Sequence, residues 1–137
     1  MEKQKFAPFL TFTGNAEEAM EFYVSTLPGA KITTLVRYGK DNPYVGEGQE
    51  NKIMYGELSF MGREIMFLDM DSASPAPDFS WSTSIYINCN DEAEFDVIFK
   101  GLSLGGMVMM GPESIGHIRK CAWVTDKFGV TWQPVWE

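Results

Sequence analysis

Two hairpins built to the same plan constrain the fold of this chain more than any other feature of its sequence. Residues 123–125 and 130–135 are rich in β-branched and aromatic residues, as strands are, and Gly129 lies in the turn between them. Residues 55–60 and 64–68 repeat this arrangement around Gly62. Glycine suits both turns because it adopts a positive φ without steric cost. A hairpin that occurs twice predicts a chain made of two similar units.

A strand and then a helix are predicted ahead of each hairpin. The strands are expected at residues 6–12 and 82–89, and the helices begin after Asn15 and Asp91, two residue types that favour the N-cap position. Residues 31–38 and 107–110 supply one more strand in each half. The apolar faces of the two helices consist of Ala16, Met20, Tyr23 and Leu27 and of Phe95, Ile98, Phe99 and Leu102.

The predicted fold class is therefore α+β, with two tandem βαβββ modules at residues 6–71 and 82–136. A Ser/Pro-rich linker, residues 72–81, joins them within a single domain that spans 1–137. Residues 39–51 form a polar loop that is long enough to act as a flap over a site. Residues 111–119 are predicted to be a second loop, and it holds the one histidine, His117.

Charge and composition exclude several classes of partner. Lys and Arg number 11 and Asp and Glu 19, so the net charge of −8 opposes binding to nucleic acid or to anionic membranes. The sequence shows no signal peptide and no run of about 20 apolar residues, so we expect a cytoplasmic protein. Cys89 and Cys121 lack a Cys-x-x-Cys spacing and are expected to be buried free thiols.

Two motifs narrow the prediction to a family. Residues 9–19, together with Phe22 and Tyr23, resemble the N-terminal signature of PhnB-like members of the vicinal oxygen chelate superfamily. Residues 122–133 resemble a second motif of the same subgroup. The superfamily includes glyoxalases, bleomycin-resistance proteins and extradiol dioxygenases. The resemblance covers nearly the whole chain and implies a curled mixed sheet from each module, helices on the outside, a cleft and a homodimer.

The resemblance also identifies four positions at which metal-dependent members hold a divalent ion. In this chain they fall at Pro8, Met66, Ser84 and Gln133. Zinc, iron and nickel prefer imidazole, carboxylate or thiolate ligands, and none of these four side chains supplies one. We therefore expect neither a metal nor another cofactor.

The cleft is expected to bind a small apolar or aromatic molecule. The candidate ligand-binding residues are Pro8, Met66, Leu68, Ser84, Tyr86, His117 and Gln133. Whether the chain also catalyses a reaction stays open at this point, and so does the role of His117, which is either a functional group or an ordinary exposed side chain.

Two alternatives remain beside metal-free binding. One is a glyoxalase-like lyase or isomerase, or a dioxygenase-like metalloenzyme, and the other is a protein that sequesters an antibiotic. The subgroup often carries the label of a 3-demethylubiquinone-9 3-methyltransferase. The chain lacks the Gly-rich turn between a strand and a helix with which a Rossmann-like fold binds a methyl donor, because Gly105 and Gly106 follow a helix.

Overall fold

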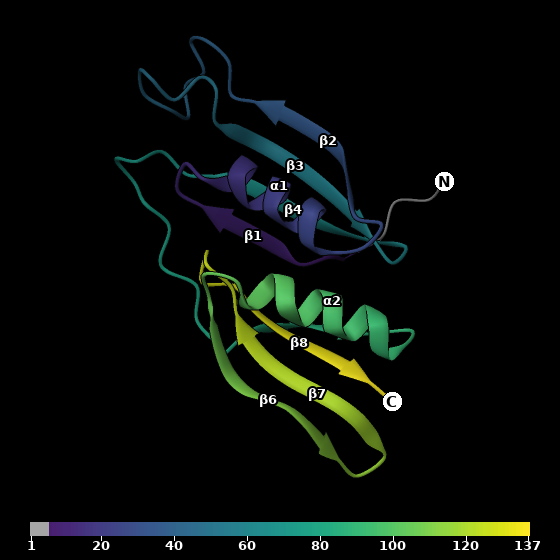
Figure 1. The fold of residues 1–137 in the computed structure, drawn as a ribbon. Coiled ribbons are helices and arrows are strands. Elements are labelled where there is room, and N and C mark those ends of the chain that lie inside the picture. The colour runs from purple at the N-terminus through teal and green to yellow at the C-terminus, as the bar shows by residue number, and fades with distance from the viewer. Residues whose placement is uncertain (1–5) are drawn as a thin grey trace. The chain divides into compact units, whose positions relative to one another are not determined.

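The structure, a computed structural model, describes residues 6–137 and shows two βαβββ modules, as the sequence predicts (Figure 1). The first contains β1 (Phe9–Phe12), α1 (Ala16–Thr26), β2 (Lys31–Arg37), β3 (Ile53–Phe60) and β4 (Arg63–Asp69). The second contains β5 (Ser84–Asn88), α2 (Glu92–Ser103), β6 (Met107–Ile115), β7 (Ile118–Thr125) and β8 (Thr131–Trp136). No helix among the described residues is long and apolar enough to cross a membrane.

The contacts within the chain divide it into two compact units. The first unit ends at Pro77 and leaves out residues 26–28, and the second contains residues 26–28 together with 78–137. Each unit holds one four-stranded mixed sheet, ordered β1-β4-β3-β2 in the first and β5-β8-β7-β6 in the second. In each sheet the first strand pairs in parallel with the last strand of its module, and the other pairings are antiparallel.

In the first unit, α1 packs its apolar stripe on one face of the sheet (Figure 1). Ala16, Met20 and Tyr23 are fully buried, and the Tyr23 ring lies 6.1 Å from that of Phe67 on β4. Gly56 on β3 makes room for this contact, because a Cβ there would lie 2.8 Å from the Met20 side chain. The predicted helix face is therefore the face that forms the core.

The start of α1 is held by a residue that the sequence analysis did not identify. Asn15 occupies the N-cap position as predicted, since its carbonyl accepts the first helical hydrogen bond, from the amide of Ala19 at 3.1 Å. The side-chain acceptor comes from Asp69 at the end of β4. Its Oδ1 accepts from the amides of Gly14 and Ala16 at 2.8 and 2.9 Å, and its Oδ2 accepts from the amide of Ile53 at 2.9 Å.

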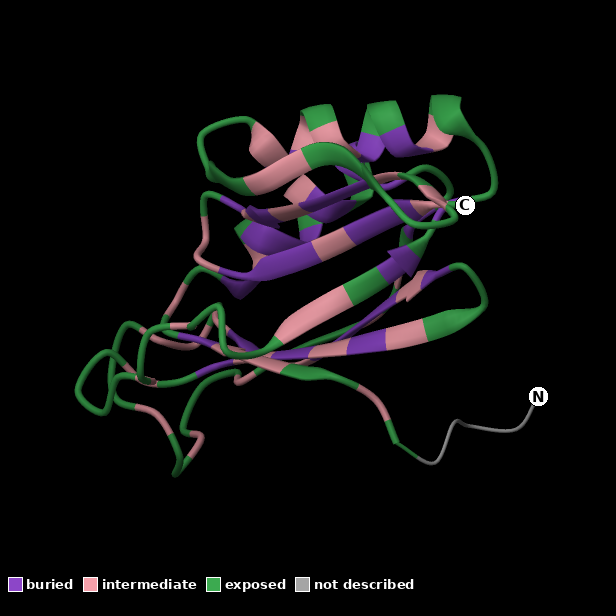
Figure 2. Cartoon of the chain, turned by 90° about the horizontal axis from the view of Figure 1, so that it is seen from below, coloured by how far each residue is buried: buried purple, intermediate pink, exposed green. Residues whose placement is uncertain are grey.

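In the second unit, α2 covers one face of the sheet with buried Phe95, Ile98 and Leu102 (Figure 2). Asp91 caps α2 as predicted, because its Oδ1 accepts from the amide of Glu94 at 2.8 Å. Trp132 of β8 is fully buried. These residues form the core of the second unit.

The prediction of a loop at residues 111–119 is wrong. Strand β6 continues from Met107 to Ile115 and pairs with β7, which begins at Ile118, so that only Gly116 and His117 form the turn. Register shifts in the β6–β7 pairing let the strand continue past Gly111 and Pro112, two residues that normally mark a strand end. Likewise β1 begins at Phe9 and not at residue 6, because Pro8 has no N–H for the sheet.

Both cysteines are free and buried, as expected. Burial raises the pKa of Cys89 to about 11 and also raises the pKa of Cys121. Because the thiolate is the reactive form, we expect neither thiol to react with Ellman's reagent in the folded protein at neutral pH, and both to react after unfolding in guanidinium. Rapid reaction of one thiol without denaturant would contradict this burial.

Candidate functional site

The residues predicted for the cleft divide between the two units. Pro8, Met66 and Leu68 belong to the first unit, and Ser84, Tyr86, His117 and Gln133 to the second. In each sheet one face is covered by the helix of its own unit, and alternation along the strands places the remaining side chains on the helix-free face.

In the second unit, Ser84, Tyr86 and Gln133 come together on the helix-free face. Gln133 on β8 pairs in register with Tyr86 on β5, and its Nε2 donates a hydrogen bond to Ser84 Oγ at 2.5 Å. The adjacent Trp132 points to the opposite face, where its Nε1 donates to Asp126 Oδ2 at 2.9 Å. Gln133 and Ser84 therefore form a neutral polar pair.

Two tryptophans add an aromatic surface to the same unit. The rings of Trp81 and Trp123 meet edge to face, with their centroids 5.8 Å apart. Trp123 lies one residue from Val124, which pairs with Trp132, so alternation places Trp123 on the face that carries Gln133. Its Nε1 is buried and has no hydrogen-bond partner among the described residues.

His117 is not part of that group. It lies in the turn before β7 begins, whereas Gln133 lies beside the other end of that strand. Its side chain is 80% exposed, and its Nε2 lies 3.6 Å from Glu137 Oε2. The structure thus places His117 at an exposed hairpin tip.

In the first unit, the strand position predicted at Met66 has an acidic neighbour. Glu57 on β3 pairs in register with Met66 and is only 9% exposed. Its carboxylate accepts hydrogen bonds from the hydroxyl of Tyr55 and, at 3.3 Å, from Thr34 Oγ1. Sequence reasoning missed Glu57, although a charged residue among the apolar residues of a predicted strand was the available signal.

The donor set does not fit a resident divalent ion. Pro8 offers only its backbone carbonyl, which already accepts from the Met66 amide at 3.0 Å, and Met66 offers a thioether. Ser84 and Gln133 are neutral and bonded to one another. Among residues 6–137 no group of three or more His, Cys, Asp or Glu side chains is arranged to hold a metal.

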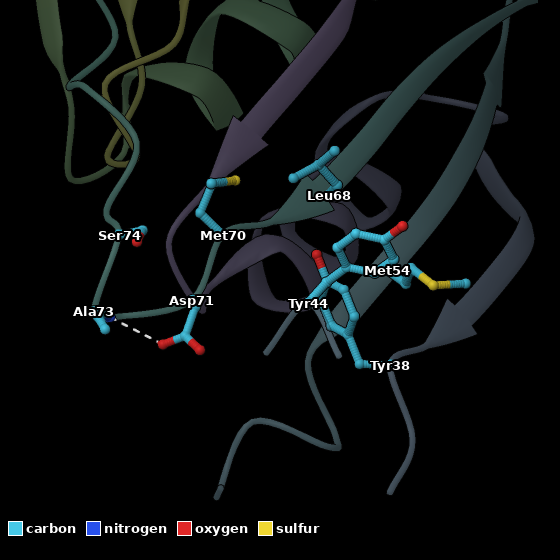
Figure 3. Close-up of a pocket in the computed structure, with 8 residues that line it drawn as sticks. All are labelled: Tyr38, Tyr44, Met54, Leu68, Met70, Asp71, Ala73 and Ser74. Atoms are coloured by element: carbon cyan, nitrogen blue, oxygen red, sulfur yellow. Dashed lines mark hydrogen bonds between the residues drawn. The ribbon is translucent and has the colours of Figure 1, made fainter. Parts of the chain in front are cut away.

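A pocket of about 470 Å³ opens in the first unit, beside the ends of β3 and β4 (Figure 3). Most of its lining is apolar. We call it the flap pocket, because Tyr44 reaches it from the loop at residues 39–51, which was predicted to act as a flap. Its lining residues are Tyr38, Tyr44, Met54, Leu68, Met70, Asp71, Ala73 and Ser74.

Hydrogen bonds fix the walls of the flap pocket. The Tyr38 hydroxyl donates to the backbone carbonyl of Asp69 at 2.6 Å, and burial raises its pKa, with a further contribution from the carboxylates of Asp69 and Asp71. The Asp71 carboxylate accepts from the amides of Ala73 and Gly46 at 2.9 and 2.6 Å, which lowers its pKa. Asp71 therefore carries a negative charge and ties the flap to the segment after β4.

The sequence analysis identified one residue of this pocket, Leu68. Asp71, Ala73 and Ser74 lie in or next to the segment that was interpreted as a linker, and Tyr38 was assigned to the end of a strand. The spacing of aromatic residues around a glycine-rich loop, at Tyr38 and Tyr44, was the signal that could have indicated a binding wall.

Comparisons of this chain with family models and with solved structures point to the same family. The family model described as 3-demethylubiquinone-9 3-methyltransferase matches residues 4–135. Protein YjdN of Escherichia coli K12 is 26% identical over 137 residues, covering 92% of this chain and 90% of that protein. The solved structure of a putative 3-demethylubiquinone-9 3-methyltransferase, PhnB protein, of Bacillus cereus is 33% identical with a TM-score of 0.83, over 98% of this chain and 100% of that chain.

More distant structures share the fold alone. A member of the glyoxalase/bleomycin resistance protein/dioxygenase superfamily from Sphaerobacter thermophilus is 16% identical, with a TM-score of 0.56 over 98% of each chain. Family model, relatives and fold agree with the resemblance seen in the two sequence motifs. The chain belongs to the PhnB-like family described as 3-demethylubiquinone-9 3-methyltransferase, and it shares its fold with members of the glyoxalase/bleomycin resistance/dioxygenase superfamily.

Proposed function

We propose that this protein binds a small, largely apolar or aromatic molecule in the flap pocket and that it does so without a metal. The observation that carries the proposal is the pocket itself. Two tyrosine rings, two methionines and a leucine line a hollow of about 470 Å³. Small-molecule sites are typically concave, apolar and of about 300–1,000 Å³, with a few polar groups that fix orientation.

The proposal is binding and not methyl transfer, although the family description names a methyltransferase. A methyl donor bound in the Rossmann manner needs a Gly-rich turn between a strand and a helix, with the helix N-terminus open to the donor. The two such connections here are residues 13–15 and 89–91, and neither has that spacing of glycines. The start of α1 is moreover occupied by the Asp69 carboxylate.

A thermal-shift screen with small aromatic compounds tests the proposal. A compound at about 100 times its dissociation constant adds about 2.7 kcal/mol to the free energy of unfolding, which is a readily measured shift in Tm. Each compound that stabilises the parent is then measured with Leu68→Trp, which fills the pocket, and with Leu35→Trp. Leu35 is an exposed leucine of β2 outside the pocket and serves as the control.

We expect Leu68→Trp to remove the stabilisation and Leu35→Trp to retain it. If both variants respond to the compounds as the parent does, the ligand binds elsewhere and the flap pocket is not the site.

The metal-free part of the proposal makes a separate prediction. Because Pro8, Met66, Ser84 and Gln133 offer no anionic or imidazole ligand, the purified protein should contain no stoichiometric zinc, nickel, iron or manganese. EDTA should leave its Tm unchanged. Elemental analysis that finds one ion per chain, with a loss of stability when the ion is removed, would restore the metalloenzyme alternative.

We also propose that the chain forms a homodimer. Strand β6 ends its sheet, and Met107, Val108 and Ile115 on it are exposed. An unpaired strand edge with apolar side chains tends to pair with another chain. Light scattering at micromolar concentration should give about twice the chain mass of 15.5 kDa, and a monomeric mass would reject the dimer.

A further inference from the structure

The flap pocket has an unbalanced charge. Among the eight described residues that line it, Asp71 is acidic and none is Lys, Arg or His. Figure 3 shows Asp71, Ala73 and Ser74 along one side of the pocket, and Tyr38, Tyr44 and Met54 along the other. A molecule in the pocket therefore has a carboxylate on one side and aromatic rings on the opposite side.

The carboxylate is held in place before any ligand arrives. Asp71 Oδ2 accepts from the Gly46 amide at 2.6 Å, and Oδ1 accepts from the Ala73 amide at 2.9 Å. Both bonds favour the ionised form, in agreement with its lowered pKa. The Ser72 side chain also hydrogen-bonds to this carboxylate. A carboxylate accepts about four hydrogen bonds, so Asp71 retains capacity for a donor on a ligand.

The opposite wall also favours positive charge. The faces of tyrosine rings carry the negative part of the aromatic quadrupole and attract ammonium and guanidinium groups within about 6 Å. The Tyr38 hydroxyl is already bonded to the Asp69 carbonyl at 2.6 Å, which fixes the position of that ring. The chain's net charge of −8 adds a long-range attraction for cations.

From this arrangement we infer that the flap pocket selects organic cations, that is, molecules with an ammonium or guanidinium group on an apolar or aromatic body. The cationic group lies between Asp71 and the tyrosine rings, and the apolar body packs on Leu68, Met54 and Met70. The inference rests on the proposed function, because it names the ligand class of the same pocket.

Three probes that share one aromatic body test the inference: naphthylmethylamine, which is a cation at neutral pH, naphthylmethanol, which is neutral, and naphthoate, an anion. We expect calorimetry to give a dissociation constant for the amine about tenfold below that of the alcohol, as an ion pair and a cation–π contact together predict, and the weakest binding for naphthoate. Added salt should reduce the difference between the amine and the alcohol.

Variants of single pocket residues test whether the preference for the amine arises in the flap pocket. Asp71→Asn should weaken binding of the amine to the level of the alcohol and leave binding of the alcohol unchanged. Asp41→Asn removes a charge from the flap loop, outside the pocket, and should change the affinity for neither probe. Tyr44→Ala should weaken the binding of both probes. Because Tyr44 is exposed, we expect this variant to fold like the parent. If Asp71→Asn does not fold, Tyr44→Ala and the salt dependence of the parent protein still decide the question.

The outcomes separate the inference from the proposal on which it rests. Equal affinity for the amine and the alcohol, or amine binding that Tyr44→Ala leaves unchanged, overturns the selection of cations. If the alcohol still binds in the pocket, the proposed function stands. If neither the probes nor the screened compounds bind, the proposed function fails, and the inference fails with it.

Discussion

Trp132→Ala should lower the free energy of unfolding by about 3–5 kcal/mol, the usual cost of truncating a fully buried tryptophan. Trp132 is 0% exposed in the core of the second unit, and its Nε1 donates to Asp126 Oδ2 at 2.9 Å. The variant therefore leaves a large cavity and also removes a donor from a buried carboxylate. Chemical denaturation of the parent and the variant, with m-values compared, measures the loss.

Gln133→Ala is the matched control on the same strand. Gln133 is half-buried on the helix-free face, and its Nε2 donates to Ser84 Oγ. Because a partly exposed polar side chain contributes within about 0.5 kcal/mol, this variant should unfold close to the parent. If Gln133→Ala is the costlier change, the register of β8 is shifted by one residue, and the assignment of the two faces of this sheet is wrong.

Asp69→Ala should cost about 3–5 kcal/mol. The Asp69 side chain is 1% exposed, and its two oxygens accept from the backbone amides of Gly14, Ala16 and Ile53. Alanine leaves these donors without their acceptor, at about 1–3 kcal/mol for each group that stays buried and unsatisfied. The carboxylate also stabilises the positive end of α1, and that contribution is lost as well.

Two comparisons make this prediction specific. Asp69→Asn keeps one carbonyl oxygen as an acceptor and should cost less than Asp69→Ala. Asp91→Ala removes the exposed cap of α2, whose side chain accepts one hydrogen bond, from the Glu94 amide. This change should lower the free energy of unfolding by about 1 kcal/mol. Equal losses for Asp69→Ala and Asp91→Ala would show that Asp69 acts as an ordinary helix cap and does not join α1 to β3 and β4.

Much of the fold could be predicted from the sequence because its signals are local. The 3.6-residue spacing of Ala16, Met20 and Tyr23 depends only on helix geometry, and the structure buries all three. The helix cap at Asp91 and the glycine turns at residues 62 and 129 are equally local. The length of β6 could not be predicted, since register shifts in its pairing with β7 decide whether a strand continues past Gly111 and Pro112.

The site was less predictable because its contacts join distant parts of the chain. Asp71 is bonded to Gly46, 25 residues away, and Asp69 to Gly14, 55 residues away. No periodicity connects such residues, and a Ser/Pro-rich composition made residues 72–81 resemble a linker. Two of the positions derived from the family resemblance, Ser84 and Gln133, do lie together, and Leu68, predicted separately as an apolar residue of the cleft, lines the pocket. The other lining residues, among them Tyr38, Tyr44 and Asp71, were not predicted.

The central claim is that a small apolar or aromatic molecule binds in the flap pocket. A titration of isotope-labelled protein with naphthylmethylamine, followed by amide correlation spectra, tests it most directly. The account predicts that the shifting amides cluster at residues 38–46, 54 and 68–74, the segments that line the pocket. Shifts centred on Ser84, Tyr86 and Gln133, or scattered over the chain without saturation, would contradict it.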